Sequence, residues 1–325
     1  MPIPRSIVAI LDPETQEIRV TAGEKAMVSV FDRSFHFGDS LYEVARSYGG
    51  TLYALGDHIA RLQRSASLAH FEELPDMDLV AGMVREACQQ FFLQFGNVEV
   101  YVRTTISRGI GDVNIDRRAA GKPYAVVIVK DLRKPVAEGQ EMTDESARLA
   151  STPPQFIPQR WVVVARRRNL VTALTPAMKS GNYLNSVLAL AEAQAQGGDD
   201  ALMLDHRGYA TEGTTSNFFA VHGEEVWTAP LDIGILAGVT RAQVLETCHD
   251  LDIPVRERLL SRYDLTRMSE LFLSSSTREV QPIVAMDGRA VGNGQPGPVT
   301  QRIATGLRAR IARWCEAHRS ESLWL

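Results

Sequence analysis

The chain has 325 residues, of which 45% are hydrophobic and 23% are charged, and its formal net charge at pH 7 is −4. This is the composition of a globular protein, and the length is sufficient for two domains. The slight acidic excess and the lack of a basic block argue against a nucleic-acid surface. No apolar run approaches the roughly 20 residues that cross a bilayer, so we expect no membrane span and a cytoplasmic protein.

Short strands and two helices are predicted over the first third of the chain. Apolar residues recur at Ile59, Leu62 and Ala66, which fall on one face of a helix. The predicted helices cover residues 57–70 and 77–92. The predicted strands cover residues 7–11, 18–21, 40–48, 51–54, 97–107 and 124–129. Together these elements predict a small α+β domain over residues 1–130.

A polar stretch over residues 131–141, with Pro135 and Gly139, is predicted to be the linker to a larger domain at 142–325. Helices are predicted there at residues 182–196, 240–251 and 298–317. The predicted strands cover residues 161–165, 201–205, 217–221, 225–228, 271–275 and 282–286. This second domain is predicted to be the richer in strands.

Cysteine and lysine are both scarce. Cys88, Cys248 and Cys315 are widely separated, which predicts neither a disulfide framework nor a metal site. Of the 35 basic residues only five are lysines: Lys25, Lys122, Lys130, Lys134 and Lys179. Lysine chemistry therefore has few candidates in this sequence.

Lys179 is the lysine with the most informative surroundings, in MKSGNYLN just before a predicted helix. Taken alone it would be a surface lysine, because a nucleophilic lysine needs desolvation or nearby cations. Taken by itself, EGTTSN at residues 212–217 predicts a turn. SSST at residues 274–277 by itself predicts a solvated turn. GILAGVTR at 234–241 places glycines before a helix and leaves N–H groups of Val239 and Thr240 available to an anion.

In combination, these motifs and the arginine of DHIARL provide what pyridoxal phosphate needs. A lysine can form a Schiff base with the cofactor aldehyde, and a carboxylate keeps the ring nitrogen protonated. Amides, hydroxyls and an arginine can bind the phosphate. The sequence therefore predicts a pyridoxal 5′-phosphate site.

The same motifs resemble the class IV, or fold-type IV, pyridoxal phosphate enzymes. The resemblance runs along nearly the whole chain, through FDRSFHFGDSLYEVARSYGG, DHIARLQRSA, YVRTTISRGIGD, KSGNYLNSVLALAEA, DDALMLDHRGYATEGTTSNFF, GILAGVTR and ELFLSSSTREVQPIVAMDG. It implies an α+β, two-domain fold: a small α/β-sandwich domain and a larger, β-rich pseudo-barrel domain that carries the lysine and binds the cofactor. It also implies a homodimer or higher homo-oligomer in which the neighbouring small domain helps to close the pocket.

The resemblance assigns roles to individual residues. Lys179 would be the catalytic Schiff-base lysine, Tyr183 would hydrogen-bond the ring hydroxyl, and Glu212 would hold the ring nitrogen. Arg61 would pair with the phosphate. The further cofactor contacts are Thr214, Thr215, Leu236, Val239, Thr240 and Ser276.

Substrate choice is divided between two groups of the family. Tyr101 and Arg103 in YVR resemble branched-chain aminotransferases, in which such residues help to recognise carboxylates. Tyr42 and Val44 in YEV resemble D-amino-acid aminotransferases instead, as does the SSST stretch. The expected substrate contacts are Phe37, Tyr42, Val44, Tyr101, Arg103 and Thr277.

The leading interpretation is a ping-pong aminotransferase that moves an amino group between a hydrophobic, branched-chain L-amino acid and 2-oxoglutarate. The partners would then be amino acids and 2-oxo acids, with no nucleic acid and no membrane. A D-amino-acid or (R)-selective amine transaminase is the alternative within the family. A lyase that eliminates pyruvate from aminodeoxychorismate and a non-enzymatic binding module are the further alternatives.

Overall fold

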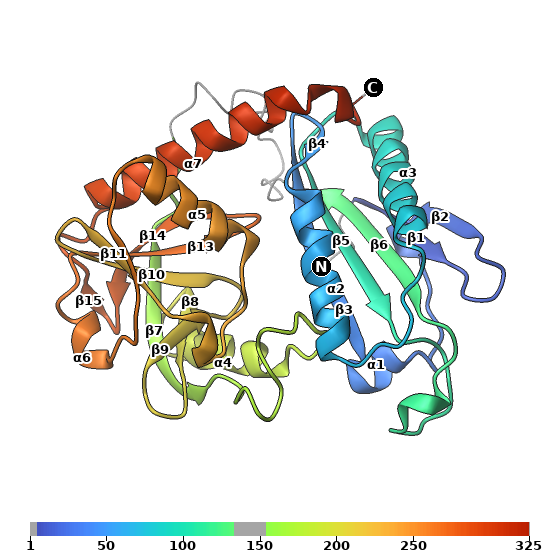
Figure 1. Cartoon of the computed structure of the whole chain (residues 1–325), viewed down its shortest axis with the longest axis horizontal. Coiled ribbons are helices and arrows are strands. Elements are labelled where there is room, and N and C mark those ends of the chain that lie inside the picture. The colour runs from blue at the N-terminus through green and yellow to red at the C-terminus, as the bar shows by residue number, and fades with distance from the viewer. Residues whose placement is uncertain (1–4, 133–153, 325) are drawn as a thin grey trace. The chain divides into compact units, whose positions relative to one another are not determined.

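The computed structural model of the protein describes residues 5–132 and 154–324 (Figure 1). These residues form two compact units. Unit 1 contains residues 5–132, Met178–Asn182 and 313–324, and unit 2 contains residues 154–177 and Tyr183–Ala312. This grouping differs from the predicted division at 131–141 because Met178–Asn182 and the end of the chain pack with the first unit. Most of the predicted linker lies outside the described residues, so the domain boundaries stay a prediction.

A six-stranded antiparallel sheet forms the centre of unit 1 within the described residues, in the order β2-β1-β6-β5-β3-β4. Its strands are β1 (Ser6–Leu11), β2 (Ile18–Ala22), β3 (Ser40–Tyr48), β4 (Thr51–Leu52), β5 (Val100–Ser107) and β6 (Tyr124–Asp131). The helices of this unit are α1 (Arg33–Phe37), α2 (Leu55–Leu68) and α3 (Met77–Phe95), with short 3₁₀ turns at Gly23–Lys25, Arg117–Ala119 and Arg319–Glu321.

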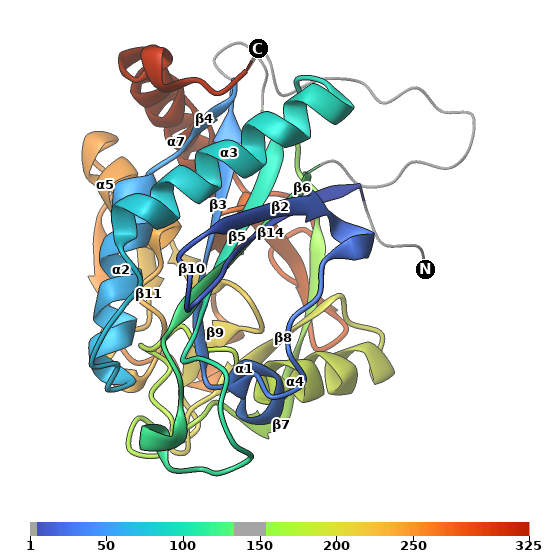
Figure 2. The ribbon, with the colours of Figure 1, turned by 90° about the vertical axis from the view of Figure 1, so that its right-hand side faces the viewer.

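Helices α2 and α3 cover one face of this sheet (Figure 1). Figure 2 shows α3 crossing over β5, β6, β1 and β2. The Asp76 side chain caps the start of α3 by accepting from the N–H groups of Asp78 and Leu79. Apolar residues of both layers meet in the core, among them Met83, Phe91, Val102 and Val127. The face of the sheet that contacts α2 and α3 is therefore part of the hydrophobic core.

Strand alternation gives the two faces of β3 and β5 different tasks. Side chains alternate along a strand, so Glu43 and Val102 point toward the helices, where they line a cavity with residues of α2 and α3. Val44 and Arg103 point the other way and are only half-buried. The face opposite the helices is where chemistry-bearing side chains of this unit can be presented.

A nine-stranded sheet forms unit 2 within the described residues, in the order β12-β11-β10-β13-β14-β7-β8-β9, with β15 paired to β14. Its strands are β7 (Gln159–Arg167), β8 (Asp200–Leu204), β9 (Ala210–Gly213), β10 (Asn217–His222), β11 (Glu225–Thr228), β12 (Val255–Glu257), β13 (Glu270–Ser275), β14 (Glu279–Met286) and β15 (Arg289–Ala290). Because β9 also pairs with β10, through Asn217 and Glu212, the sheet closes on itself. The predicted α+β fold with a barrel-like, β-rich part is confirmed.

The core of unit 2 contains Trp161, Leu202, Phe218 and Leu273. Its helices are α4 (Leu184–Ala195), α5 (Val239–Asp250) and α6 (Arg262–Leu265), with a 3₁₀ turn at Leu231–Ile233. Helix α7 (Pro298–Ala317) belongs to unit 2 up to Ala312 and to unit 1 beyond it. Small residues of α4, such as Ala189 and Ala193, allow it to pack closely on β7 and β8. In the described part of the chain, no helix combines the length and apolarity needed to cross a membrane.

The predicted helices are all present, and the last one has the bounds expected, Pro298–Ala317. The strand expected at 51–54 is wrong beyond Leu52, because Ala54 takes a positive φ and caps α2. Sequence patterns missed the short elements α1, α6, β9, β12 and β15. Helix α1 is only five residues long and depends on local capping by Asp32 and on Gly38, whose φ is 63°.

Candidate active site

Backbone hydrogen bonds join the segment that contains Lys179 to β3 in unit 1. The Tyr42 N–H donates to the Lys179 carbonyl at 3.0 Å, and the Gly181 N–H donates to the Ser40 carbonyl at 2.8 Å. On the other side of the lysine, its own N–H donates to Ser65 Oγ of α2 at 3.1 Å. Residues 179–181 therefore extend the sheet by one short antiparallel bridge, although they are far from β3 in the sequence.

The Lys179 amine contacts Tyr42, which lies opposite it across this bridge. Nζ is 3.1 Å from the Tyr42 hydroxyl oxygen and 4.2 Å from the ring centroid. The Arg103 guanidinium carbon is 3.6 Å from the same centroid, and Val44 is the cross-strand partner of Arg103. Four of the residues predicted from sequence, one catalytic and three for substrate, thus come together on one face of the unit 1 sheet.

Arg61 is buried, with an exposed fraction of 4%, and is held by a carboxylate. Its Nε and Nη2 donate to the two Glu43 oxygens at 2.7 and 2.6 Å. His58 Nδ1 lies 2.8 Å from Glu43 Oε2. Arg61 precedes Ser65 by one turn of α2, so the arginine and the anchoring point of Lys179 lie on the same side of the helix.

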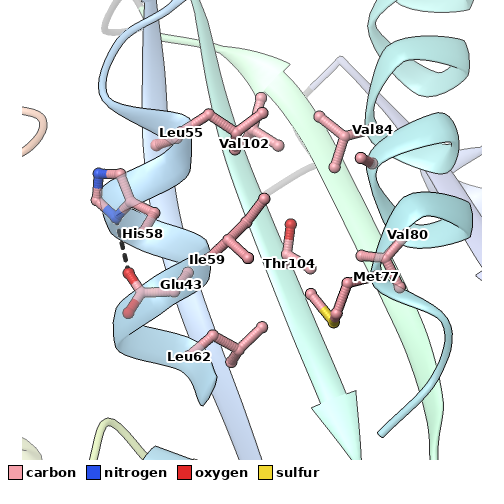
Figure 3. Close-up of a pocket in the computed structure, with 12 residues that line it drawn as sticks. Glu43, Leu55, His58, Ile59, Leu62, Met77, Val80, Val84, Val102 and Thr104 are labelled. Atoms are coloured by element: carbon pink, nitrogen blue, oxygen red, sulfur yellow. Dashed lines mark hydrogen bonds and ion pairs between the residues drawn. The ribbon is translucent and has the colours of Figure 1, made fainter. Parts of the chain in front are cut away.

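Figure 3 shows Glu43 and His58 at the edge of a small cavity between the sheet and helices α2 and α3. The cavity has a volume of about 20 Å³, which is room for one water molecule. Its other walls are mainly apolar, from residues such as Leu62, Met77 and Val84. Burial in these surroundings would raise the pKa of Glu43, but hydrogen bonds from Arg61 and His58 outweigh it and lower the pKa to about 2.

Phe37 and Tyr101, the two other substrate residues predicted in unit 1, make their described contacts elsewhere. Phe37 ends α1, and its ring lies 5.0 Å from the guanidinium carbon of Arg33. Tyr101 is paired with Arg46 across β5 and β3, and Lys130 lies 4.7 Å from its ring.

Glu212 is the centre of a buried network in unit 2. Its Oε1 accepts from Arg168 Nε at 2.9 Å, and its Oε2 accepts from the Leu236 N–H at 3.1 Å and from Asn217 Nδ2 at 3.3 Å. Asn217 Nδ2 also donates to the Leu236 carbonyl at 2.9 Å. The carboxylate is therefore held in one orientation by a cation, an amide and a backbone N–H.

The same network places the N-terminus of α5. Gly238 precedes the helix, and a Cβ on it would lie 2.0 Å from Asn217 Oδ1. No side chain of the described residues caps this helix, so the N–H groups at Val239 and Thr240 are offered to an anion together with the positive end of the helix dipole.

The predicted hydroxyl residues of unit 2 fall into two sets. The Thr214 hydroxyl donates to Asp200 at 2.6 Å, and the Thr215 hydroxyl accepts from Arg278 at 3.1 Å. Arg278 also pairs with Asp200 at 3.3 Å. Ser276 and Thr277 lie in the turn between β13 and β14 and are half-buried. Tyr183 is half-buried at the start of α4.

Comparison with known proteins identifies the family. A family model described as "Amino-transferase class IV" matches residues 40–286. A Methanocaldococcus jannaschii protein provisionally named a branched-chain-amino-acid aminotransferase is 33% identical over 290 residues, 89% of this chain and 93% of its own. The chain belongs to the class IV aminotransferases.

Two further relatives point to different groups within this family. A D-alanine aminotransferase of Bacillus licheniformis is 30% identical, over 90% of this chain and 95% of its own. The branched-chain aminotransferase of Thermoproteus uzoniensis, solved with norvaline, has a TM-score of 0.80 at 28% identity and covers 97% of each chain.

Class IV aminotransferases use pyridoxal 5′-phosphate, and the residues present here fit that group. Taken separately, unit 1 contains a lysine amine and a buried arginine, and unit 2 contains a fixed carboxylate and a helix N-terminus without a side-chain cap. Ser274 faces Asn217 across β13 and β10, and its buried hydroxyl has no partner among the described residues. A polar atom without a partner beside the Glu212 network is suited to a bound ligand.

Sequence reasoning missed the residues that hold the predicted ones. Glu43, Arg168, Asn217 and Asp200 were not singled out, although Asn217 is part of EGTTSN and Glu43 part of YEV. Glu43, Arg168 and Asp200 act through partners 14 to 44 positions away in the sequence, whereas Asn217 bonds Glu212 five positions away. One signal was available in the sequence: Glu43 is a carboxylate that lies between two predicted site residues, Tyr42 and Val44.

The lowered pKa of Glu43 predicts a pH-dependent stability. Ionised Glu43 contributes roughly 3 kcal/mol, which is fully present above its ordinary pKa of 4.5 and is lost as the pH falls through about 2. Glu43→Gln removes the negative charge of the carboxylate and leaves the Arg61 guanidinium buried without that charge beside it. We expect the variant to unfold at a lower temperature than the wild type at pH 7, and the difference to narrow steadily from pH 5 to pH 3.

Thermal unfolding midpoints measured across this pH range test the prediction. Glu24→Gln, at an exposed glutamate of the same unit, is the matched control and should track the wild type throughout. A difference between wild type and Glu43→Gln that stays constant with pH would contradict the assignment.

Proposed function

We propose that the protein transfers the amino group between a hydrophobic, branched-chain L-amino acid and 2-oxoglutarate by a ping-pong mechanism. The observation that carries the proposal is the fixed Lys179 amine, 3.1 Å from Tyr42 on a sheet face that also carries Arg103. Branched-chain aminotransferases recur among the relatives, including that of Salmonella typhimurium at 30% identity over 86% of both chains.

The proposed cofactor contacts follow the roles that the family resemblance assigns. Lys179 supplies the amine, Glu212 holds the ring nitrogen, and Tyr183 hydrogen-bonds the ring hydroxyl. Arg61, Ser276 and the N–H groups of Val239 and Thr240 take the phosphate, Leu236 packs on the ring, and Thr214 and Thr215 stabilise the loop beside it. When bound, the cofactor accepts the electron pair left behind as the substrate loses its α-proton.

The proton is handled by the protein. Lys179 Nζ would accept the proton from the substrate α-carbon and deliver it to C4′ of the bound cofactor, not back to the α-carbon, so that the amino group could stay with the cofactor. Arg168 keeps the Glu212 carboxylate turned in one direction, so its negative charge is available to hold a proton at the ring nitrogen. The proposed substrate contacts are Phe37, Tyr42, Val44, Tyr101, Arg103 and Thr277, with Arg103 for a carboxylate and Val44 for an apolar side chain.

A D-amino-acid transaminase is the second candidate, because Tyr42 and Val44, in YEV, resemble D-amino-acid aminotransferases. The D-alanine aminotransferase of Bacillus licheniformis supports this candidate, because it is 30% identical to this chain, as is the branched-chain aminotransferase of Salmonella typhimurium. Even one methylene in a pocket changes discrimination by about 1–3 kcal/mol, so Val44 is able to change the preferred substrate.

A half-reaction separates the two candidates. L-leucine and D-alanine are each added, without an oxo acid, to the yellow enzyme, and the absorbance of the cofactor is followed. We expect L-leucine to produce the pyridoxamine form at least ten times faster than D-alanine. Addition of 2-oxoglutarate should then restore the original absorbance, as a ping-pong mechanism requires.

Lys179→Ala is the matched control, and it should lack both the visible absorbance of the lysine-bound cofactor and the conversion. Faster conversion by D-alanine would replace the first candidate with the second. Conversion at an unchanged rate in Lys179→Ala would contradict both.

We further propose that the enzyme is a homodimer. Two segments of unit 1 expose apolar side chains side by side, joined by a hydrogen bond from the Gly111 N–H to the Phe31 carbonyl at 3.1 Å. Phe35 is 69% exposed and Ile115 is 85% exposed. Exposed apolar patches of this kind are typical of protein interfaces.

Light scattering tests this proposal. The wild type should have twice the 35.9 kDa mass of one chain. The double variant Phe35→Ser, Ile115→Ser should shift toward the monomer, whereas Leu93→Ser, at a residue of α3 that is 66% exposed, should remain dimeric. A monomeric wild type would contradict the proposal.

A further inference from the structure

Tyr42 contacts the reactive amine more directly than a substrate-binding role requires. Its side chain is 4% exposed, and its hydroxyl oxygen is 3.1 Å from Lys179 Nζ. A substrate contact alone does not explain why this hydroxyl meets the Lys179 amine.

The backbone fixes the geometry of this contact. Tyr42 and Lys179 lie directly opposite each other across the short bridge between β3 and residues 179–181. Directly opposed residues of an antiparallel pair project from the same face with their Cβ atoms about 5 Å apart. The Lys179 N–H is also bound to Ser65 of α2, so the base of the lysine side chain has little freedom to move away.

Arg103 fixes the ring of Tyr42. Its guanidinium carbon is 3.6 Å from the ring centroid, and its Nε donates to Thr105 Oγ1 at 3.3 Å. Thr105 is the cross-strand partner of Tyr42, and Arg103 is the diagonal neighbour on the same face. A cation stacked on a tyrosine restrains the ring while leaving its hydroxyl edge available.

We propose that Tyr42 is a positioning residue whose hydroxyl holds the Lys179 amine whenever that amine is not bonded to the cofactor, with Arg103 as the clamp on its ring. A lysine has a long, flexible stem and loses rotamer entropy when its amine is confined. The Tyr42 hydroxyl confines Nζ before the proton moves. The inference rests on the proposed role of Lys179 as the base that accepts the substrate α-proton.

The proton transfer itself balances without Tyr42. The α-proton passes to the lone pair of Lys179 Nζ, the electron pair of the broken C–H bond goes to the cofactor, and the tyrosine hydroxyl keeps its proton throughout. Tyr42 affects the fraction of time for which Lys179 Nζ lies where it can accept the α-proton. Its removal should therefore slow proton transfer and leave substrate binding little changed.

Tyr42→Phe tests the proposal with two readouts. The first is a single-turnover half-reaction with whichever of L-leucine or D-alanine the wild type converts, in the α-protio and α-deutero forms. We expect the rate at saturating substrate to fall about 3- to 10-fold, which is the effect of one lost hydrogen bond, with a nearly unchanged substrate dissociation constant. The deuterium isotope effect should rise, because proton transfer becomes slower relative to the other steps.

The second readout is independent of turnover. The full-length protein without cofactor is acetylated briefly, and the modification of Lys179 is compared by mass spectrometry with that of the exposed Lys25. Tyr42→Phe releases the amine from its hydrogen bond, so the ratio of Lys179 to Lys25 labelling should rise several-fold. Tyr263→Phe, at a tyrosine that is 69% exposed, is the control and should match the wild type in both readouts.

The outcomes separate the possible roles of Tyr42. A raised dissociation constant with an unchanged isotope effect and unchanged labelling would limit Tyr42 to a substrate contact and overturn the proposal. A wild type that converts neither amino acid would mean that the proposed function has failed. The labelling ratio would still decide whether Tyr42 holds the amine.

Discussion

The backbone bridge between residues 179–181 and β3 is the constraint on which the chemistry of this protein depends. A lysine is useful to an aldehyde cofactor only if its amine stays in one place, and a long side chain does not achieve this alone. Here the Tyr42 N–H and the Ser65 hydroxyl bind the backbone of Lys179 from two sides. The small α+β unit thus holds the lysine proposed to bond the cofactor, although Lys179 belongs by sequence to the second half of the chain.

A second feature is shared by the two units: each buries a carboxylate against an arginine. Glu43 is paired with Arg61 in unit 1, and Glu212 with Arg168 in unit 2. Compared with an apolar pair of similar volume, such a pair adds little net stability, but the loss of one partner leaves a buried charge at a cost of about 3–5 kcal/mol. The contribution of these pairs is to hold each carboxylate in one orientation. Because Glu43 already balances the charge of Arg61, the proposed phosphate site depends also on the uncapped N-terminus of α5.

The sequence predicts the elements and the motifs of this protein much better than it predicts their partners. Helix 298–317 and strand 40–48 follow from local periodicity, and KSGNYLN and EGTTSN follow from their resemblance to the family. The contact between Lys179 and Tyr42 spans 137 positions, and that between Glu212 and Arg168 spans 44. No local pattern encodes such contacts, because they depend on which strands become neighbours. The assignment of residues 179–181 to unit 1 could not be predicted from sequence for the same reason.

The central claim is that the amine held beside Tyr42 is the one that bonds the cofactor. Borohydride reduction of the yellow holoenzyme, followed by digestion and mass spectrometry of the peptides, identifies the attached lysine directly. With only five lysines in the chain, the result is unambiguous. The account predicts the reduced cofactor on Lys179 alone. Attachment to Lys25, Lys122, Lys130 or Lys134, or to no lysine, would contradict it.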